Sequence, residues 1–179
     1  CVSERAFNQV RDVDGRGGRP LKHWTCADIV QSVLSLAHAR IDDLPLLRAL
    51  YNEALERLRN GLDTNPGSSH SRESFRPWEV SVLLWAQARL YLKSPQGVIF
   101  RAFQAEAVHR LYSLLKGGPS PQEGRLGSQE QANVAWALTV LEEFDSSETV
   151  ELLAIIFEDA ATSCEKDGLI QLEHAHQLW

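Results

Sequence analysis

Methionine is absent from the sequence, and cysteine is scarce. Because the chain begins with Cys1 and contains no methionine, we expect it to be part of a longer protein. Cys1, Cys26 and Cys164 lie far apart and form no CxxC pair, which argues against a disulfide framework and against a zinc site. Nor is there a run of about 18 apolar residues, so we expect a soluble protein without a transmembrane helix.

The sequence also lacks a basic excess. It has 24 Asp and Glu residues against 18 Lys and Arg residues, a formal net charge of -6 and an isoelectric point near 5.5. A protein that binds nucleic acid alone is usually basic, because Lys and Arg neutralise phosphates and release counterions. The overall charge therefore argues against autonomous, tight binding of RNA or DNA and leaves a local basic strip possible.

Catalytic and metal-binding patterns are missing as well. His174 and His176 are two residues apart and would point to nearly opposite sides of a helix, and no HExxH pattern accompanies them. The Gly/Arg-rich tract at 15–19 has no GK[ST] sequence and no preceding strand, so it is not a phosphate-binding loop of the Walker type. We expect no enzymatic activity, no cofactor, no metal and no small-molecule substrate.

What the sequence does contain is a repeated helical pattern. Three tracts, beginning near residues 25, 76 and 127, each combine a polar cap, an apolar helix, a short break and a second apolar helix. Leu34, Trp85 and Trp136 are separated by one offset, since 85 − 34 and 136 − 85 both equal 51. The first helix of each tract is alanine-rich and apolar on more than one face, which indicates that it is covered on two sides.

We therefore predict an all-α fold, an α-solenoid of stacked antiparallel helix hairpins with a right-handed stack. Thr25 with Asp28, and Ser128 with Gln131, are candidate capping boxes, and Pro45 suits the first turn of a helix. The expected helices lie near residues 26–39, 44–60, 78–92, 97–116, 128–142 and 147–163. The expected units are 1–23 (end of a preceding repeat and a Gly/Arg-rich turn), 24–60 (repeat 1), 61–77 (loop), 78–116 (repeat 2), 117–127 (loop), 128–167 (repeat 3) and 168–179 (start of a further helix).

The tract LGSQEQANVAWALTVLEEFDSSETVELLAII contains the phrase S-x-x-Q-A-N-x-x-W-A-L-x-x-L, and the tract FRPWEVSVLLWAQARLYL keeps part of it in Trp85, Ala86 and Leu90. The phrase is formed by Ser128, Gln131, Ala132, Asn133, Trp136, Ala137, Leu138 and Leu141. In these residues the chain resembles octotricopeptide-repeat and RAP-domain proteins, a group that includes the FAST-kinase-like proteins. The second tract has Val82 where Asn133 stands, and the tract 168–179 resembles the segment that precedes the RAP domain.

The resemblance implies an RNA-associated protein of an organelle, located in the mitochondrial matrix or alternatively in another organelle. It implies transcript stabilisation, RNA processing or a structural position in a mitochondrial ribosome, with rRNA and neighbouring proteins as partners and no membrane. The acidic balance keeps a second hypothesis open, namely a purely protein-binding helical scaffold subunit of a large mitochondrial complex.

The candidate RNA-binding residues are basic side chains in loops or near helix ends, together with one amide of the repeated phrase. They are Arg16, Arg19, Arg72, Arg76, Lys93 and Asn133. Arg89, Lys116 and Arg125 are further candidates for phosphate contacts, and for each of these basic residues a solvated surface position is the alternative. Trp85 and Trp136 could stack on bases, but their apolar surroundings favour a core position. We expect Trp136 to be buried, because three neighbouring alanines leave room for its ring.

Overall fold

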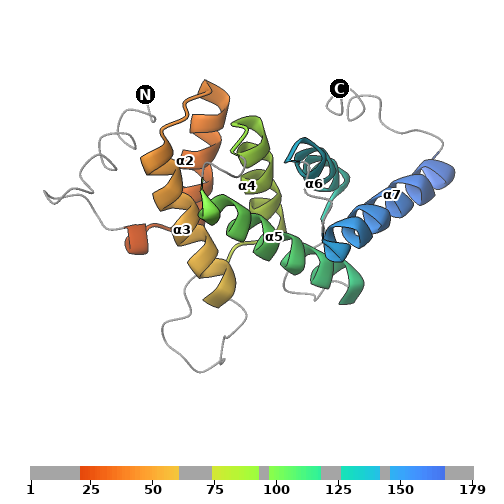
Figure 1. Ribbon diagram of the computed structural model, residues 1–179. Coiled ribbons are helices and arrows are strands. Elements are labelled where there is room, and N and C mark those ends of the chain that lie inside the picture. The colour runs from red at the N-terminus through yellow and green to blue at the C-terminus, as the bar shows by residue number, and fades with distance from the viewer. Residues whose placement is uncertain (1–20, 61–73, 93–96, 118–125, 142–145, 168–179) are drawn as a thin grey trace, which may run out of the picture.

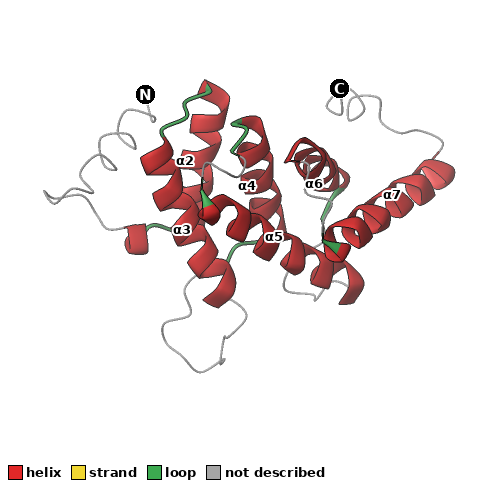
Figure 2. Cartoon of the chain, in the orientation of Figure 1, coloured by secondary structure: helices red, strands yellow, loops and turns green. Residues whose placement is uncertain are grey.

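The computed structural model describes residues 21–60, 74–92, 97–117, 126–141 and 146–167 (Figure 1). Within these ranges every regular element is a helix and no strand occurs, which confirms the all-α fold (Figure 2). The elements are the short 3-10 helix η2 (Leu21–His23) and the α-helices α2 (Cys26–Ala39), α3 (Leu44–Asn60), α4 (Pro77–Arg89), α5 (Val98–Gly117), α6 (Ser128–Leu141) and α7 (Ser147–Asp167).

Local side-chain chemistry explains where several helices begin. The Thr25 hydroxyl accepts a hydrogen bond from the Asp28 amide at 3.1 Å, and the Asp28 carboxylate accepts one from the Thr25 amide at 2.8 Å, so the capping box expected here is present. The second expected box is wrong: α6 already begins at Ser128, and the Gln131 side chain instead donates to the Asp159 carboxylate of α7 at 2.8 Å.

The ends of α2 and α4 share one geometry. Arg40 and Tyr91 follow the last turns in the left-handed region, with φ of 53° and 56°. After each of them, the next amide donates back five residues, from Ile41 to the Leu36 carbonyl and from Leu92 to the Gln87 carbonyl. This is a Schellman closure. It ends α4 at Arg89, before the expected boundary near residue 92.

Alternate helices lie side by side. The helix α4 packs between α2 and α6, and α5 packs between α3 and α7, so the first helices of the three tracts form one row and the second helices form another (Figure 1). Each first helix also contacts the second helix that follows it. The row of first helices, α2, α4 and α6, therefore has an inner side that packs against the row of second helices and an outer side that faces away from it.

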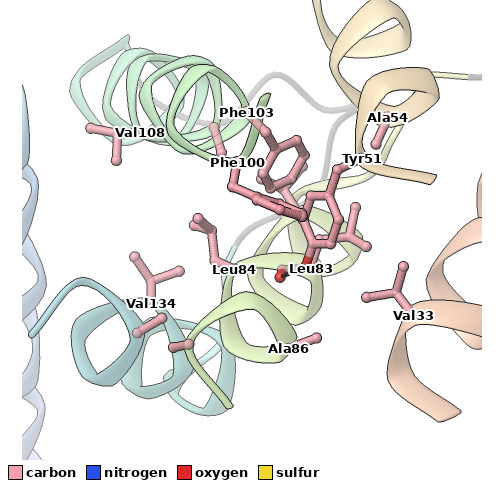
Figure 3. Close-up of a cluster of buried hydrophobic side chains, with 14 of the residues drawn as sticks. Val33, Tyr51, Ala54, Leu83, Leu84, Ala86, Phe100, Phe103, Val108 and Val134 are labelled. Atoms are coloured by element: carbon pink, nitrogen blue, oxygen red, sulfur yellow. Dashed lines mark hydrogen bonds between the residues drawn. The ribbon is translucent and has the colours of Figure 1, made fainter. Parts of the chain in front are cut away.

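The core lies between the two rows and centres on Tyr51 of α3. Its ring meets Phe100 and Phe103 of α5 edge to face, with centroid distances of 5.2 and 4.9 Å (Figure 3). The Tyr51 hydroxyl donates to the Leu83 carbonyl of α4 at 2.8 Å, and all these residues are buried. A single cluster of buried apolar side chains continues from α2 to α7.

Polar contacts also join elements near the beginning and near the end of the described chain. Near the N-terminal end, the guanidinium of Arg57 is buried, pairs with Glu53 at 2.8 Å and donates to the Leu21 carbonyl at 3.1 Å. At the other end, His109 Nδ1 of α5 lies 3.1 Å from the Glu148 carboxylate of α7.

None of the helices in the described part of the chain combines the length and apolar character that a membrane crossing requires.

Candidate functional site

A groove of about 540 Å³ runs across the outer side of the first-helix row. Its volume is within the range of small-molecule and nucleotide sites. It is lined by Leu34 and His38 of α2, by Val82, Trp85 and Arg89 of α4, and by Gln129, Ala132, Asn133 and Trp136 of α6.

The groove results from the repeated pattern of the sequence. On α4 the lining side chains are Val82, Trp85 and Arg89, at positions i, i+3 and i+7, which share one face of a helix. On α6, Asn133 and Trp136 occupy the places that Val82 and Trp85 take on α4, 51 residues earlier in the sequence. Because α4 and α6 lie side by side, equivalent positions of successive repeats face the same hollow.

Three aromatic rings form a ladder along this groove. The His38 and Trp85 rings are 5.4 Å apart between centroids, and the Trp85 and Trp136 rings are 6.3 Å apart, with interplanar angles of 46° and 37°. Both indoles pack against the core but remain half-buried. The expectation that Trp136 is buried between helices is therefore wrong, because no described helix covers the outer side of the row on which it lies.

The charge of the groove differs from that of the whole chain. None of the described residues that line it carries a carboxylate, whereas the chain has a net charge of -6. Arg89 and His38 are both exposed at its edge. Arg89 forms no ion pair with any described residue, so no described carboxylate competes with an anionic ligand for its guanidinium.

One amide in the groove wall is held in a defined orientation. The Asn133 carbonyl oxygen accepts a hydrogen bond from the Gln129 amide nitrogen at 3.1 Å, one turn earlier on α6. Within the described residues, the Asn133 amide nitrogen has no acceptor. Asn133 therefore presents its N–H donors to a ligand, together with the second lone pair of its oxygen.

The structure separates the residues that the sequence suggested as RNA contacts. Asn133 lies in the groove, whereas Arg76 is exposed at the residue before α4 and is not among the lining residues. The remaining four candidates, Arg16, Arg19, Arg72 and Lys93, lie outside the described residues.

The sequence analysis does not single out the groove residue His38, and it names Arg89 only among several basic side chains that could contact phosphate. Both stand four residues after a position of the 51-residue offset, His38 after Leu34 and Arg89 after Trp85, so the helical period together with this offset selects them. His38 contacts Trp85, and this contact depends on the packing of α2 against α4.

Metal ligation and covalent catalysis receive no support from the described residues. No group of three or more His, Cys, Asp or Glu side chains gathers there in a way that could hold a metal ion. Cys26 is buried, and His174 and His176 lie outside the described residues. What the groove offers chemically is aromatic surface, a cation and hydrogen-bond donors.

Comparisons with protein-family models, with curated proteins and with solved structures find no match for this chain.

Proposed function

We propose that this chain is an RNA-associated α-solenoid of the octotricopeptide-repeat and RAP-domain type, and that it acts as a structural component of a mitochondrial ribosome. In this proposal it holds rRNA and neighbouring proteins in the mitochondrial matrix. The observation that carries the proposal is the groove, in which Trp85 and Trp136 stand beside Arg89 and no described lining residue carries a carboxylate.

The packing of the helices supports the solenoid. In such a fold each repeat contacts mainly its neighbours, and the first helices of successive repeats line one continuous surface. The contacts of α4 with α2 and α6, and of α5 with α3 and α7, fit this scheme. The matching closures at Arg40 and Tyr91, 51 residues apart, fit a structural unit of that length.

The chemistry of the groove supports RNA as the ligand. Proteins that bind single-stranded nucleic acid combine aromatic side chains, on which bases stack, with cations that contact the backbone. The groove combines both, whereas the rest of the chain is acidic on balance. Few phosphates can be neutralised by one arginine, so binding by the isolated chain is weak and neighbouring subunits supply further cations.

The test is ultraviolet crosslinking of the chain to rRNA in mitochondrial ribosomes that have been washed at high salt, with the crosslinked peptides identified by mass spectrometry. Crosslinks in α4 or α6 are the expected result. In parallel, Arg16, Arg19, Arg72, Arg76 and Lys93 are all changed to Glu, a melt confirms folding, and incorporation into the particle is expected to fall. Undiminished incorporation together with no RNA crosslink to the parent chain would refute the proposal.

A second candidate, the protein-binding scaffold, is favoured by the outer side of α7. Val150, Ala154 and Phe157 follow one another at i, i+4 and i+7 and are exposed, Val150 by 52% and Phe157 by 61%. Such a stripe is typical of a surface that another protein covers. If Phe157→Lys prevented incorporation of the folded chain while the parent gave no RNA crosslink, the scaffold would be the better description.

A further inference from the structure

We infer that the groove binds unpaired nucleotides, with a base stacked on the exposed face of Trp85 or Trp136 and a phosphate near Arg89. This inference rests on the proposed function, because it names the kind of RNA and the part of the nucleotide that the groove recognises. It goes further in excluding double-stranded RNA as the ligand of this site.

The aromatic faces of Trp85 and Trp136 are only partly covered. Two indoles that stacked fully on each other would cover one face of each ring. Trp85 and Trp136 are instead tilted by 37° at a centroid distance of 6.3 Å, and both are only half-buried. Part of each ring therefore remains uncovered on the groove side, and a planar ligand can stack on it.

The polar groups of Trp85, Trp136, Arg89 and Asn133 in the groove are mainly hydrogen-bond donors. An indole N–H and a guanidinium can only donate hydrogen bonds. Neither indole nitrogen of Trp85 and Trp136 donates to a described residue, and the Asn133 oxygen is already engaged by Gln129. A complementary ligand is therefore planar, rich in acceptors and negatively charged, as nucleotides are.

Unpaired and paired RNA offer different surfaces to such a groove. In a duplex each base face is covered by the next base pair, and proteins recognise A-form RNA mainly through its shape, its 2′-hydroxyls and its phosphates. Stacking on Trp85 needs an uncovered base face, which only loops, bulges, ends and single strands provide. Among the described residues that line the groove, Arg89 is the one arginine, so these residues offer too few contacts with a duplex backbone to replace the stacking.

The experiment measures binding of the full 179-residue chain to a short fluorescein-labelled unpaired RNA and to the same RNA annealed to its complement. We expect the unpaired RNA to bind at least about tenfold more tightly, since base stacking provides most of the affinity. Trp136→Leu keeps an apolar side chain but removes the aromatic face, and it should weaken binding about tenfold. The matched control is Trp78→Phe, which changes an exposed tryptophan of α4 that does not line the groove and should leave affinity unchanged.

Salt dependence tests the position of the phosphate. For single strands the slope of log affinity against log salt changes by about 0.7 for each phosphate contact. Arg89→Gln should make the slope shallower by about that amount, whereas the same change at Arg101, an exposed residue of α5 outside the groove, should leave the slope unchanged. An unchanged slope in Arg89→Gln would overturn the placement of the phosphate.

The outcomes distinguish this inference from the proposed function. If rRNA crosslinks to the chain in the ribosome but duplex binds as well as unpaired RNA, or if Trp136→Leu binds like the parent, the inference is wrong and the function stands. Melting of each variant ensures that a loss is not due to unfolding. A proline-rich peptide is the competing kind of ligand for an aromatic groove. Tight binding of such a peptide, combined with no binding of either RNA, would overturn both the inference and its premise.

Discussion

Replacing Tyr51 by phenylalanine isolates the one hydrogen bond that ties α3 to the backbone of α4. The hydroxyl is fully buried and donates to the Leu83 carbonyl at 2.8 Å. The ring itself, with its contacts to Phe100 and Phe103, stays in place in this variant (Figure 3). The substitution therefore removes a donor without creating a large cavity.

The magnitude follows from that geometry. A buried hydrogen bond between neutral groups contributes about 1 kcal/mol to the free energy of unfolding. For a chain of this length, that corresponds to a fall of roughly 2–4 °C in melting temperature. Tyr51→Ala would in addition leave a cavity and lose both edge-to-face contacts, and it should cost about 4–5 kcal/mol, at the upper end for buried aromatic truncations.

The pH dependence gives a second, independent measurement. Burial raises the pKa of Tyr51 well above its usual value of about 10. Because the unfolded state then loses this proton first, the contribution of Tyr51 to stability is fully present below pH 10 and is lost as the pH rises above it. We expect the free energy of unfolding of the parent to fall by up to about 1.4 kcal/mol more per pH unit in this range than that of Tyr51→Phe.

The assay is urea unfolding, followed by circular dichroism, of the parent and Tyr51→Phe from about pH 8 to about pH 11. Tyr91→Phe is the matched control. Because Tyr91 is 57% exposed, the stability of this variant should depend on pH as that of the parent does. If Tyr51→Phe had the stability of the parent at pH 8 and the same slope at alkaline pH, the buried hydroxyl and its bond to α4 would be refuted.

Three further predictions concern other parts of the molecule. Arg57→Met should lower the free energy of unfolding in urea by about 3–5 kcal/mol, because it leaves the Glu53 carboxylate buried and unpaired. Adding Glu53→Leu should recover much of this loss, and no recovery would contradict a buried pair. Trp136→Ala should cost about 1–3 kcal/mol in a thermal melt, less than a fully buried tryptophan, and a loss above that range would place the ring in the core. The pKa of the Glu151 carboxyl is lowered by the hydrogen bond from Tyr112 and then by a neighbouring lysine charge. Tyr112→Phe should therefore raise that pKa toward its usual value in an NMR titration. An unchanged pKa would show that the hydrogen bond does not form.

Much of the helical organisation could be predicted from residues close together in the sequence. A capping box spans three residues, so Thr25 and Asp28 already place the start of α2. Apolar side chains at i, i+4, i+7 and i+8, such as Leu47, Tyr51, Ala54 and Leu55, place the buried face of α3. These signals depend on local hydrogen bonds and on the helical period, and they require no knowledge of neighbouring helices.

The end of α4 is not encoded in the apolar pattern alone. That pattern continues through Leu92 and predicts a helix that reaches this residue. The left-handed conformation of Tyr91 ends it earlier, and no glycine marks the position. Leu92 is nevertheless buried, because the Schellman closure turns its side chain back onto the core. The apolar pattern therefore predicts the burial of Leu92 correctly but its helical conformation wrongly.

The candidate site depended still more on tertiary structure. By itself the sequence determined the helices, their repeat of 51 residues and the places of Trp85 and Trp136 on the first helix of each tract. Only the packing decided that these indoles face a groove, because helical periodicity identifies an apolar face without showing whether another layer covers it. The contacts of α4 with α2 and α6 bring His38, Trp85 and Trp136 into one ladder and leave its outer side uncovered among the described residues.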